Sequence, residues 1–279
     1  MKKKYVAVLP IAGLFIAGSV FFQSAYSYEL LLMMPPILAG AQQGTGTVIG
    51  WQPLNDTGIT WGGDYPSGNN TGCTGVEIGA QDCSHGRDVT HYDNSDGFAG
   101  FSYTKLDSSG APLSQSAASW DCVQDNVTGL IWEVKTDDDG LHDKDDRYNW
   151  YNTDSATNGG ADGYADDHGD ICYGYNNSDS ATYCNTQAYV NRVNTASLCG
   201  ATDWRMPTVN DLESLVHYGR SNPAIDTGYF PNTVSSYVWS GSPYAAYSAR
   251  AWFVNFNYGY SSASFRVSDF AVRLLRGGQ

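Results

Sequence analysis

The sequence is poor in several features that would indicate common functions. It has 15 Lys and Arg against 29 Asp and Glu, a formal net charge of −14, so it lacks the basic surface that nucleic-acid binding requires. Neither a G-x-S-x-G nor an H-E-x-x-H motif occurs, and the five His do not fall at metal-ligand spacing. These absences argue against nucleic-acid binding, serine hydrolase chemistry and zinc protease chemistry.

Only one long apolar run is present, and it lies at the N-terminus. Lys2, Lys3 and Lys4 precede the apolar stretch 5–22, and Ala25-Tyr26-Ser27 provides a small-x-small cleavage motif. This pattern predicts a signal peptide over residues 1–27 and therefore export. An uncleaved membrane anchor is the alternative, because the stretch is about long enough to span a bilayer. No membrane span is expected after cleavage.

Cysteines are few and widely spaced. There are six, and none precedes Cys73, so no lipoprotein attachment site is expected. An even number in an exported protein predicts three disulfides. Local closure favours Cys73–Cys83 and Cys172–Cys184, which leaves Cys122 for Cys199. A zinc site is the weaker alternative, since no C-x-x-C pair is present.

Glu is also scarce, with only four among the 29 acidic residues, whereas Gly (31) and Tyr (20) are abundant. Asp favours turns and caps, and Glu favours helix interiors, so the chain should be rich in loops. Residues 28–118 should form an irregular extension with short strands near 47–51 and 98–106. A Ser/Ala/Gly linker, 108–119, should end it. The main domain then spans 119–279.

The main domain contains signals for both helices and strands. A buried strand is predicted over 128–135 and a helix over 185–198. A second helix should follow Pro207, with Thr208 as its N-cap and Asp211 completing a capping box. Arg205, just before it, should anchor a carboxylate. Short strands are expected at 237–240, 251–256, 264–267 and 272–275. Two helices and several antiparallel strands indicate the α+β class.

The C-terminal tail is dense in Tyr and Ser, a composition typical of adaptable binding surfaces. We expect an exposed face built from 244–250 and 258–270 to contact the ligand. Its predicted ligand-binding residues are Tyr244, Tyr247, Arg250, Phe253, Tyr258, Tyr260, Ser261, Ser262, Ser264, Phe265, Arg266, Ser268, Asp269 and Phe270. The core beneath should contain Trp239, Trp252, Val254, Phe256, Val272 and Leu274.

Acidic residues cluster in the loops between 137 and 170. Hard cations prefer such oxygen ligands, so calcium is the one cofactor that we consider. Its predicted ligands are Asp137, Asp139, Asp143, Asp145, Asp166 and Asp170. An exposed acidic loop without metal is the favoured alternative. Glu133, at a strand end, and Glu213, in a first helical turn, are interpreted as structural, and His217 is expected on a helix surface.

Several short motifs, in order, resemble the Lcl C-terminal domain family, which is named for a collagen-like bacterial adhesin. They are Thr128-Gly-Leu-Ile-Trp-Glu133, Leu198-Cys-Gly200, Asp203-Trp-Arg-Met-Pro-Thr208, Leu212-Glu-Ser-Leu215, Tyr229-Phe-Pro231, Trp239-Ser240 and Val272-Arg-Leu274. The resemblance covers about residues 120–276. It implies a C-type-lectin-like fold and a surface binding role.

The resemblance sets limits on function as well. Formylglycine-generating enzymes, which share that fold, use late cysteines, and no Cys follows Cys199 here. The adhesin that names the family binds sulfated glycans, but this chain lacks collagen repeats and is acidic. A local basic patch of Arg250, Arg266, Arg273 and Arg276 could still serve such a ligand.

The tail is also similar to the variable region of proteins diversified by retroelements. Adenine mutagenesis of Asn codons in a template yields codons that never encode Lys, Glu, Gln, Met or Trp. None of those five occurs from Tyr258 to Val272. The sequence as a whole therefore predicts an exported, non-enzymatic adhesion or ligand-binding protein whose partner is an unknown protein or glycan. The alternatives are a periplasmic glycan hydrolase and a structural component of a surface appendage.

Overall fold

The computed structural model describes residues 55–64, 68–70, 82, 86–90 and 94–277. All of them fall within the unit that runs from Trp51 to Gln279. The predicted signal peptide, the strand expected at 47–51 and the predicted Cys73–Cys83 bridge lie outside the described residues. None of the helices in the described part is both long enough and apolar enough to cross a membrane.

A four-stranded antiparallel sheet forms one half of the framework. It contains β3 (Tyr103–Leu106), β4 (Cys122–Asp125), β5 (Leu130–Glu133) and β11 (Leu275–Gly277), in the order β11-β5-β4-β3. The central strand β5 lies within the stretch 128–135 that the sequence predicts as a strand. The last strand of the chain thus pairs directly with this early strand.

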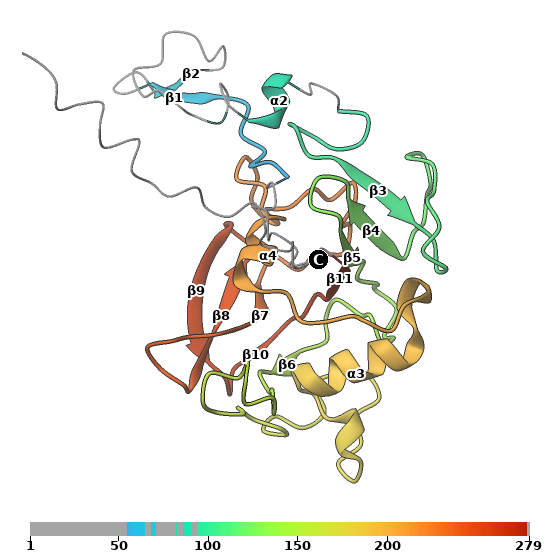
Figure 1. Cartoon of the computed structure of the whole chain (residues 1–279), viewed down its shortest axis with the longest axis vertical. Coiled ribbons are helices and arrows are strands. Elements are labelled where there is room, and N and C mark those ends of the chain that lie inside the picture. Colours follow the sequence, from blue (N-terminus) through green and yellow to red (C-terminus); the bar gives the residue numbers. More distant parts are fainter. Residues whose placement is uncertain (1–54, 65–67, 71–81, 83–85, 91–93, 278–279) are drawn as a thin grey trace, which may run out of the picture. The chain divides into compact units, whose positions relative to one another are not determined.

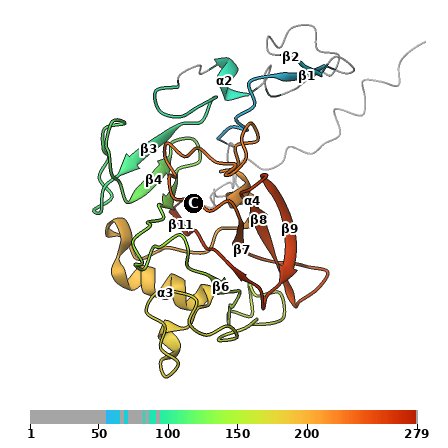
Figure 2. The ribbon, with the colours of Figure 1, turned by 180° about the vertical axis from the view of Figure 1, so that it is seen from behind.

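A three-stranded antiparallel sheet forms the other half. It contains β7 (Tyr237–Pro243), β8 (Arg250–Asn255) and β9 (Tyr260–Phe265), in the order β7-β8-β9. β9 lies at the outer margin of this sheet in two opposite views (Figure 1 and Figure 2). It replaces the strand predicted at 264–267, because pairing with β8 rather than intrinsic propensity fixes the strand position.

Short contacts join the two sheets. β6 (Tyr148–Asn149) pairs with β10 (Asp269–Phe270), and single bridges connect Val238 with Ala271 and Arg205 with Leu275. The segment 266–277 therefore leaves β9, pairs with β6 and continues into β11. The residues after β9 are consequently part of the domain framework.

The helices begin where the sequence indicates. α3 (Thr186–Ala196) has Asn185 as its N-cap, and its C-cap is in the left-handed conformation. α4 (Val209–Glu213) is capped by Thr208 and shows the predicted reciprocal capping box with Asp211. A four-residue helix, α2 (Arg87–Thr90), precedes both. With these few helices and several short antiparallel strands, the chain has the predicted α+β architecture.

Two clusters of buried side chains form the core. One joins β3, β5 and α4 to the β7–β8 hairpin, and the other joins α3 and β6 to the same hairpin. The predicted core residues Trp239, Val254, Phe256, Val272 and Leu274 are all buried. Trp252 is only partly buried, so its assignment to the core was wrong.

Two disulfides are formed as the sequence predicts. Cys172–Cys184 closes a local loop, with a sequence separation of 12. Cys122–Cys199 joins β4 to the turn after α3 across a separation of 77 residues. The long bridge thus fastens α3 to the four-stranded sheet.

Residues 94–118 are integrated into the domain rather than being a separate extension. β3 belongs to the four-stranded sheet, and the predicted linker after it is folded back. The Lys105 Nζ donates hydrogen bonds to the carbonyls of Gln115 (3.1 Å) and Ala117 (3.0 Å). It also lies 3.6 Å from the ring centroid of Trp120. The compact unit therefore begins well before the boundary predicted at residue 119.

Earlier residues also pack on the domain, at His217. The Tyr218 N–H donates to the Thr57 carbonyl at 2.8 Å, and the rings of Phe98 and His217 stack with centroids 5.5 Å apart. His217 is only 1% exposed. Its prediction as a helix-surface residue was wrong, because α4 ends before it and Gly58, Phe98 and Phe101 pack against its ring.

Candidate functional site

The strand register assigns each side chain of the three-stranded sheet to one of its two faces, since directly opposed residues share a face. The first face holds the pairs Arg250–Phe265, Trp252–Ala263 and Val254–Ser261. The second holds Ala251–Ser264, Phe253–Ser262 and Asn255–Tyr260. The residues predicted to form one continuous binding face therefore belong to both sides of the sheet.

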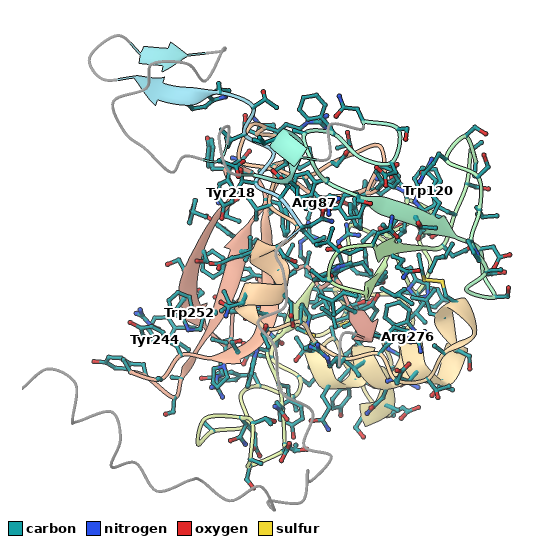
Figure 3. The ribbon with its side chains drawn as sticks, turned by 45° about the horizontal axis from the view of Figure 1, so that its top comes forward. Arg87, Trp120, Tyr218, Tyr244, Trp252 and Arg276 are labelled. Atoms are coloured by element: carbon teal, nitrogen blue, oxygen red, sulfur yellow. A yellow bond between two sulfur atoms is a disulfide. The ribbon has the colours of Figure 1, made fainter. Side chains whose placement is uncertain are left out.

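Aromatic rings and one cation gather on the exposed part of the first face. We call this surface the aromatic–arginine face, and it consists of Tyr244, Tyr247, Arg250, Trp252 and Phe265. The rings of Tyr244 and Trp252 meet edge to face, with centroids 5.3 Å apart, at the margin of the sheet (Figure 3). Tyr247 is 65% exposed and Phe265 is 50% exposed. The face thus presents ring surface directly to solvent.

Arg250 occupies the middle of the aromatic–arginine face. Its guanidinium carbon lies 4.4 Å from the Phe265 ring centroid and 5.8 Å from that of Tyr247. Its Nε is buried without a hydrogen-bond partner, and no ion pair to Arg250 occurs among the described residues. No Asp or Glu occurs between Asp226 and Asp269, although the chain has 29 acids. Among the described residues this cation is therefore without an ion pair, and it lies within a long stretch of sequence that has no carboxylate.

The second face of the sheet is largely covered. Phe253 is 7% exposed and contacts the rings of Tyr237, Trp239 and Phe270 at 4.9, 6.4 and 5.2 Å. Its prediction as an exposed ligand contact was wrong. The alternation of side chains along β8 places it on the second face, against Phe270 of β10.

Arg266 is buried as well, contrary to its prediction as a ligand-binding charge. It is 0% exposed, and its guanidinium lies 3.9 Å from the Trp150 ring centroid. It donates hydrogen bonds to the carbonyls of Asn158, at 2.9 Å, and Ala161. Because backbone carbonyls satisfy its donors, Arg266 fastens the loop 158–161 to the end of β9.

The four arginines proposed as a basic patch do not form one. Arg273 is buried and donates to the Glu133 carbonyl at 2.6 Å. Arg276 pairs with Asp203 at 2.6 Å. With Arg266 also buried, only Arg250 remains as an accessible, unpaired cation of this set.

The remaining predicted tail residues are spread over the same region. Ser261 lies opposite Val254 on the first face, whereas Tyr260, Ser262 and Ser264 lie on the second. Tyr258 is 66% exposed in the turn before β9. Ser268 is within hydrogen-bond distance of Ser264, at 3.1 Å, and Asp269 and Phe270 form β10. The exposed ends of β9, rather than its whole length, therefore carry the aromatic contacts.

The six predicted calcium ligands are not gathered into one site. Asp143 accepts backbone N–H groups of Asp138 and Asp139 at 2.8 Å each and of Asp145 at 2.7 Å. Lys144 bridges Asp137 and Asp145, at 2.7 Å each. Within the described residues, no three acidic, His or Cys side chains are placed to hold a metal ion. The predicted grouping of these carboxylates around calcium is not supported by this arrangement.

A buried charge network surrounds Glu133, which the sequence predicts as a structural residue at the end of a strand. The Glu133 carboxylate accepts hydrogen bonds from Lys135 Nζ (3.1 Å), the Tyr189 hydroxyl and the Leu274 N–H (2.9 Å), and it pairs with His142 at 2.9 Å. Burial acts to raise the pKa of Glu133, but Lys135, His142 and Tyr189 together lower it to about 2. The carboxylate is therefore held ionised as a structural group.

A groove of about 530 Å³ lies beside the C-terminal end of β7, in the three-stranded sheet. Its walls come from the loop after β6, the start of α3, the segment 205–208 and the end of β7. It is lined by Trp150, Tyr151, Asn152, Thr157, Thr186, Gln187, Val190, Arg205, Met206, Pro207, Thr208, Gly241, Ser242 and Pro243. No acidic residue lines it. Sequence reasoning noted residues 203–208 as a motif but did not place a groove there.

Arg205 is anchored at the edge of this groove as predicted. Its Nη1 lies 3.1 Å from the Asp211 carboxylate, which also accepts the Thr208 N–H of the capping box. The motif 203–208 therefore sets the start of α4 and one wall of the groove at the same time.

Comparisons with known proteins give one match. A search of curated proteins and a search of solved structures each found none. The model of the Lcl C-terminal domain matches residues 121–276, a range that includes both sheets from β4 onward, the groove and the aromatic–arginine face. The chain therefore belongs to the Lcl C-terminal domain family.

Proposed function

We propose that the chain is an exported, non-enzymatic ligand-binding protein, and that the aromatic–arginine face contacts the ligand. The observation that carries this proposal is Arg250, a cation that lies between exposed rings and makes no ion pair among the described residues. Desolvated aromatic and Arg side chains contribute most to binding energy at protein interfaces. Family membership and two disulfides, which are typical of exported proteins, are consistent with a binding role outside the cytoplasm.

The arrangement of the acids favours binding over glycan hydrolysis. A glycosidase needs two carboxylates on either side of its substrate cleft. The groove is lined by none, and the buried Glu133 is held ionised by Lys135 and its other partners. A general acid would instead need a raised pKa and access to the substrate.

The first experiment is a glycan array probed with the full mature chain and with single variants. The array should contain neutral, uronic-acid and sulfated glycans, and it should be read with and without calcium, because calcium is the cation that the acidic loops between 137 and 170 would favour. We expect Arg250→Ala and Tyr247→Ala to weaken binding by at least about tenfold. Matched controls are Arg276→Ala and Tyr164→Ala, which change the same residue types elsewhere on the surface. Equal binding by Arg250→Ala and wild-type protein would remove this face from the proposal.

We also propose that the tail is a diversified region, so that the ligand differs between copies of the gene. The codon-compatible composition from Tyr258 to Val272 supports this. The test is to sequence the DNA flanking the gene. A near-copy of the last hundred or so bases with Asn codons at tail positions, beside a reverse transcriptase, is the expected result. Its absence would mean that the tail is a fixed surface.

A further inference from the structure

Among the described residues, the backbone of β9 is paired on one side only, with β8. The Arg250 carbonyl accepts the Tyr244 N–H at 3.1 Å, and the Phe256 N–H donates to the Ser236 carbonyl at 2.9 Å. Even-numbered residues of β8 thus direct their backbone groups toward β7. In an antiparallel ladder the residues between them must then bond to β9. The Arg266 N–H, which donates to the Ala249 carbonyl at 2.9 Å, agrees with this phase.

This phase fixes which groups of β9 point away from the sheet. Tyr260, Ser262 and Ser264 exchange hydrogen bonds with β8, so the N–H and C=O groups of Ser261 and Ala263 face outward. No hydrogen bond from any described residue engages them. The Phe265 carbonyl is already used, because it accepts the Ser268 N–H at 2.9 Å. The outer edge of β9 therefore offers two successive donor–acceptor sites.

The edge of β9 lacks the usual protection against strand pairing. Natural proteins block exposed edges with Lys, Pro, bulges or a covering segment. β9 has the sequence YSSASF, without a charge or proline, and its register with β8 is unbroken from Tyr260 to Phe265. Both opposite views of the ribbon show β9 at the outer margin (Figure 1 and Figure 2).

Charge indicates what would pair with this edge. The Arg250 guanidinium reaches from β8 to β9 and lies over the Phe265 ring, 4.4 Å from its centroid, one strand closer to the open edge. A strand added beside β9 would place alternate side chains on the same face as Phe265. A carboxylate there would meet a cation that makes no ion pair within the described part of the chain, in a stretch from 227 to 268 without a single acidic residue.

We propose that the ligand is an extended, acidic polypeptide segment that adds to β9 as a fourth strand. Its backbone bonds to Ser261 and Ala263, and one of its carboxylates pairs with Arg250 beside the rings of Phe265 and Tyr247. Strand addition of this kind obtains affinity from main-chain hydrogen bonds and specificity from side-chain contacts. This inference rests on the proposed function, since it names the ligand class for the same face.

The test uses the full mature chain and immobilised peptides of alternating Thr and Glu, alternating Thr and Lys, and the Thr–Glu peptide N-methylated at every residue. We expect binding to the Thr–Glu peptide only, because the N-methylated peptide cannot donate its backbone hydrogen bonds. Arg250→Gln should weaken that binding by at least about tenfold. Amide hydrogen exchange should show the Ser261 and Ala263 N–H groups protected only in the complex.

Ala263→Pro is the matching change in the protein, because it removes an outward N–H that β8 does not use. We expect it to fold and to lose peptide binding, whereas Ser262→Pro, which removes an inward N–H, should destabilise the sheet. The N-methylated peptide and hydrogen exchange test the same bond if Ala263→Pro does not fold.

The other outcomes are distinguishable. Glycan binding that depends on Arg250 but leaves Ser261 and Ala263 unprotected would overturn strand addition and leave the proposed function standing. Equal binding of N-methylated and unmodified peptides would also overturn strand addition. So would a wild-type protein that binds no peptide but forms a dimer, if Ala263→Pro converts that dimer to a monomer. Binding to neither glycans nor peptides would overturn both proposals.

Discussion

Replacing the buried carboxylate of Glu133 should reveal how strongly the charge network holds the fold. In Glu133→Gln, the amide keeps the size of the side chain but loses the charge that faces Lys135, His142 and the Leu274 N–H. Lys135 and Arg273 are 5% and 2% exposed, so two buried cations would lose their common anion. Removing one partner of a buried ion pair costs about 3–5 kcal/mol.

The pKa of Glu133 gives an independent magnitude. It is lowered from its usual value of 4.5 to about 2 in the folded chain. A tenfold change in proton affinity corresponds to about 1.4 kcal/mol, so ionised Glu133 contributes roughly 3 kcal/mol to the free energy of unfolding. Because the folded pKa is the lower one, this contribution is fully present above pH 4.5 and is lost as the pH falls toward 2.

Urea denaturation of the disulfide-bonded protein between pH 7 and pH 2 measures both effects. We expect Glu133→Gln to lower the free energy of unfolding by about 3–5 kcal/mol at pH 7, and the difference from wild type to shrink below pH 4.5. Glu213→Gln is the matched control: Glu213 makes no ion pair among the described residues, so its change should stay within about 0.5 kcal/mol. A loss below about 1 kcal/mol for Glu133→Gln at pH 7 would refute the assigned role of the network.

Three further predictions concern stability and can be measured by the same denaturation experiments. Arg266→Ala should destabilise the chain by about 3 kcal/mol, because buried carbonyls lose their donors. Arg250→Ala should change the free energy of unfolding by less than about 0.5 kcal/mol. Similar losses for the two variants would contradict the difference in their burial. Replacing Cys122 and Cys199 by Ser should cost about 4 kcal/mol, because the bridge closes a long loop across a separation of 77 residues, and an unchanged midpoint would argue that the bridge is dispensable. Burial, and to a smaller extent Arg220, lowers the pKa of His217 from 6.5. The contribution of neutral His217 to stability should therefore be fully present above pH 6.5 and fall as the pH decreases below it. His217→Leu should flatten that part of the plot of stability against pH, and an unaltered slope would assign the pH dependence to other groups.

Local signals in the sequence predicted local structure well. Thr208 and Asp211, three residues apart, form the predicted capping box, and the helix predicted from residue 185 begins there, with Asn185 as its N-cap. These predictions succeed because a cap depends on side chains within one helical turn. The two described disulfides were predicted for a related reason, since few partners were available once local closure was assumed.

The binding face was predicted only in part, because its geometry depends on contacts distant in sequence. The run from Tyr260 to Phe265 has four consecutive small residues between two aromatic ones, so hydrophobicity gives no sign of which face each side chain occupies. Arg266 was expected in solvent because charged residues are seldom fully buried. Its acceptors are the carbonyls of Asn158 and Ala161, more than 100 residues earlier in the chain, and no local pattern could reveal them.

The same tail can hold the fold together and still vary in side chain. β9 is held to β8 by backbone hydrogen bonds, which every residue except proline can supply. Outward side chains such as Tyr247 and Phe265 contribute contact surface rather than core packing. Replacing Arg266 would leave buried carbonyls without donors, and replacing Phe253 would remove packing against the rings around it. A ligand strand bonded to Ser261 and Ala263 would likewise use backbone groups that substitution does not alter. Under the two proposals together, strand addition would remain common to all variants of the tail, and changes around Arg250 would select among acidic partners.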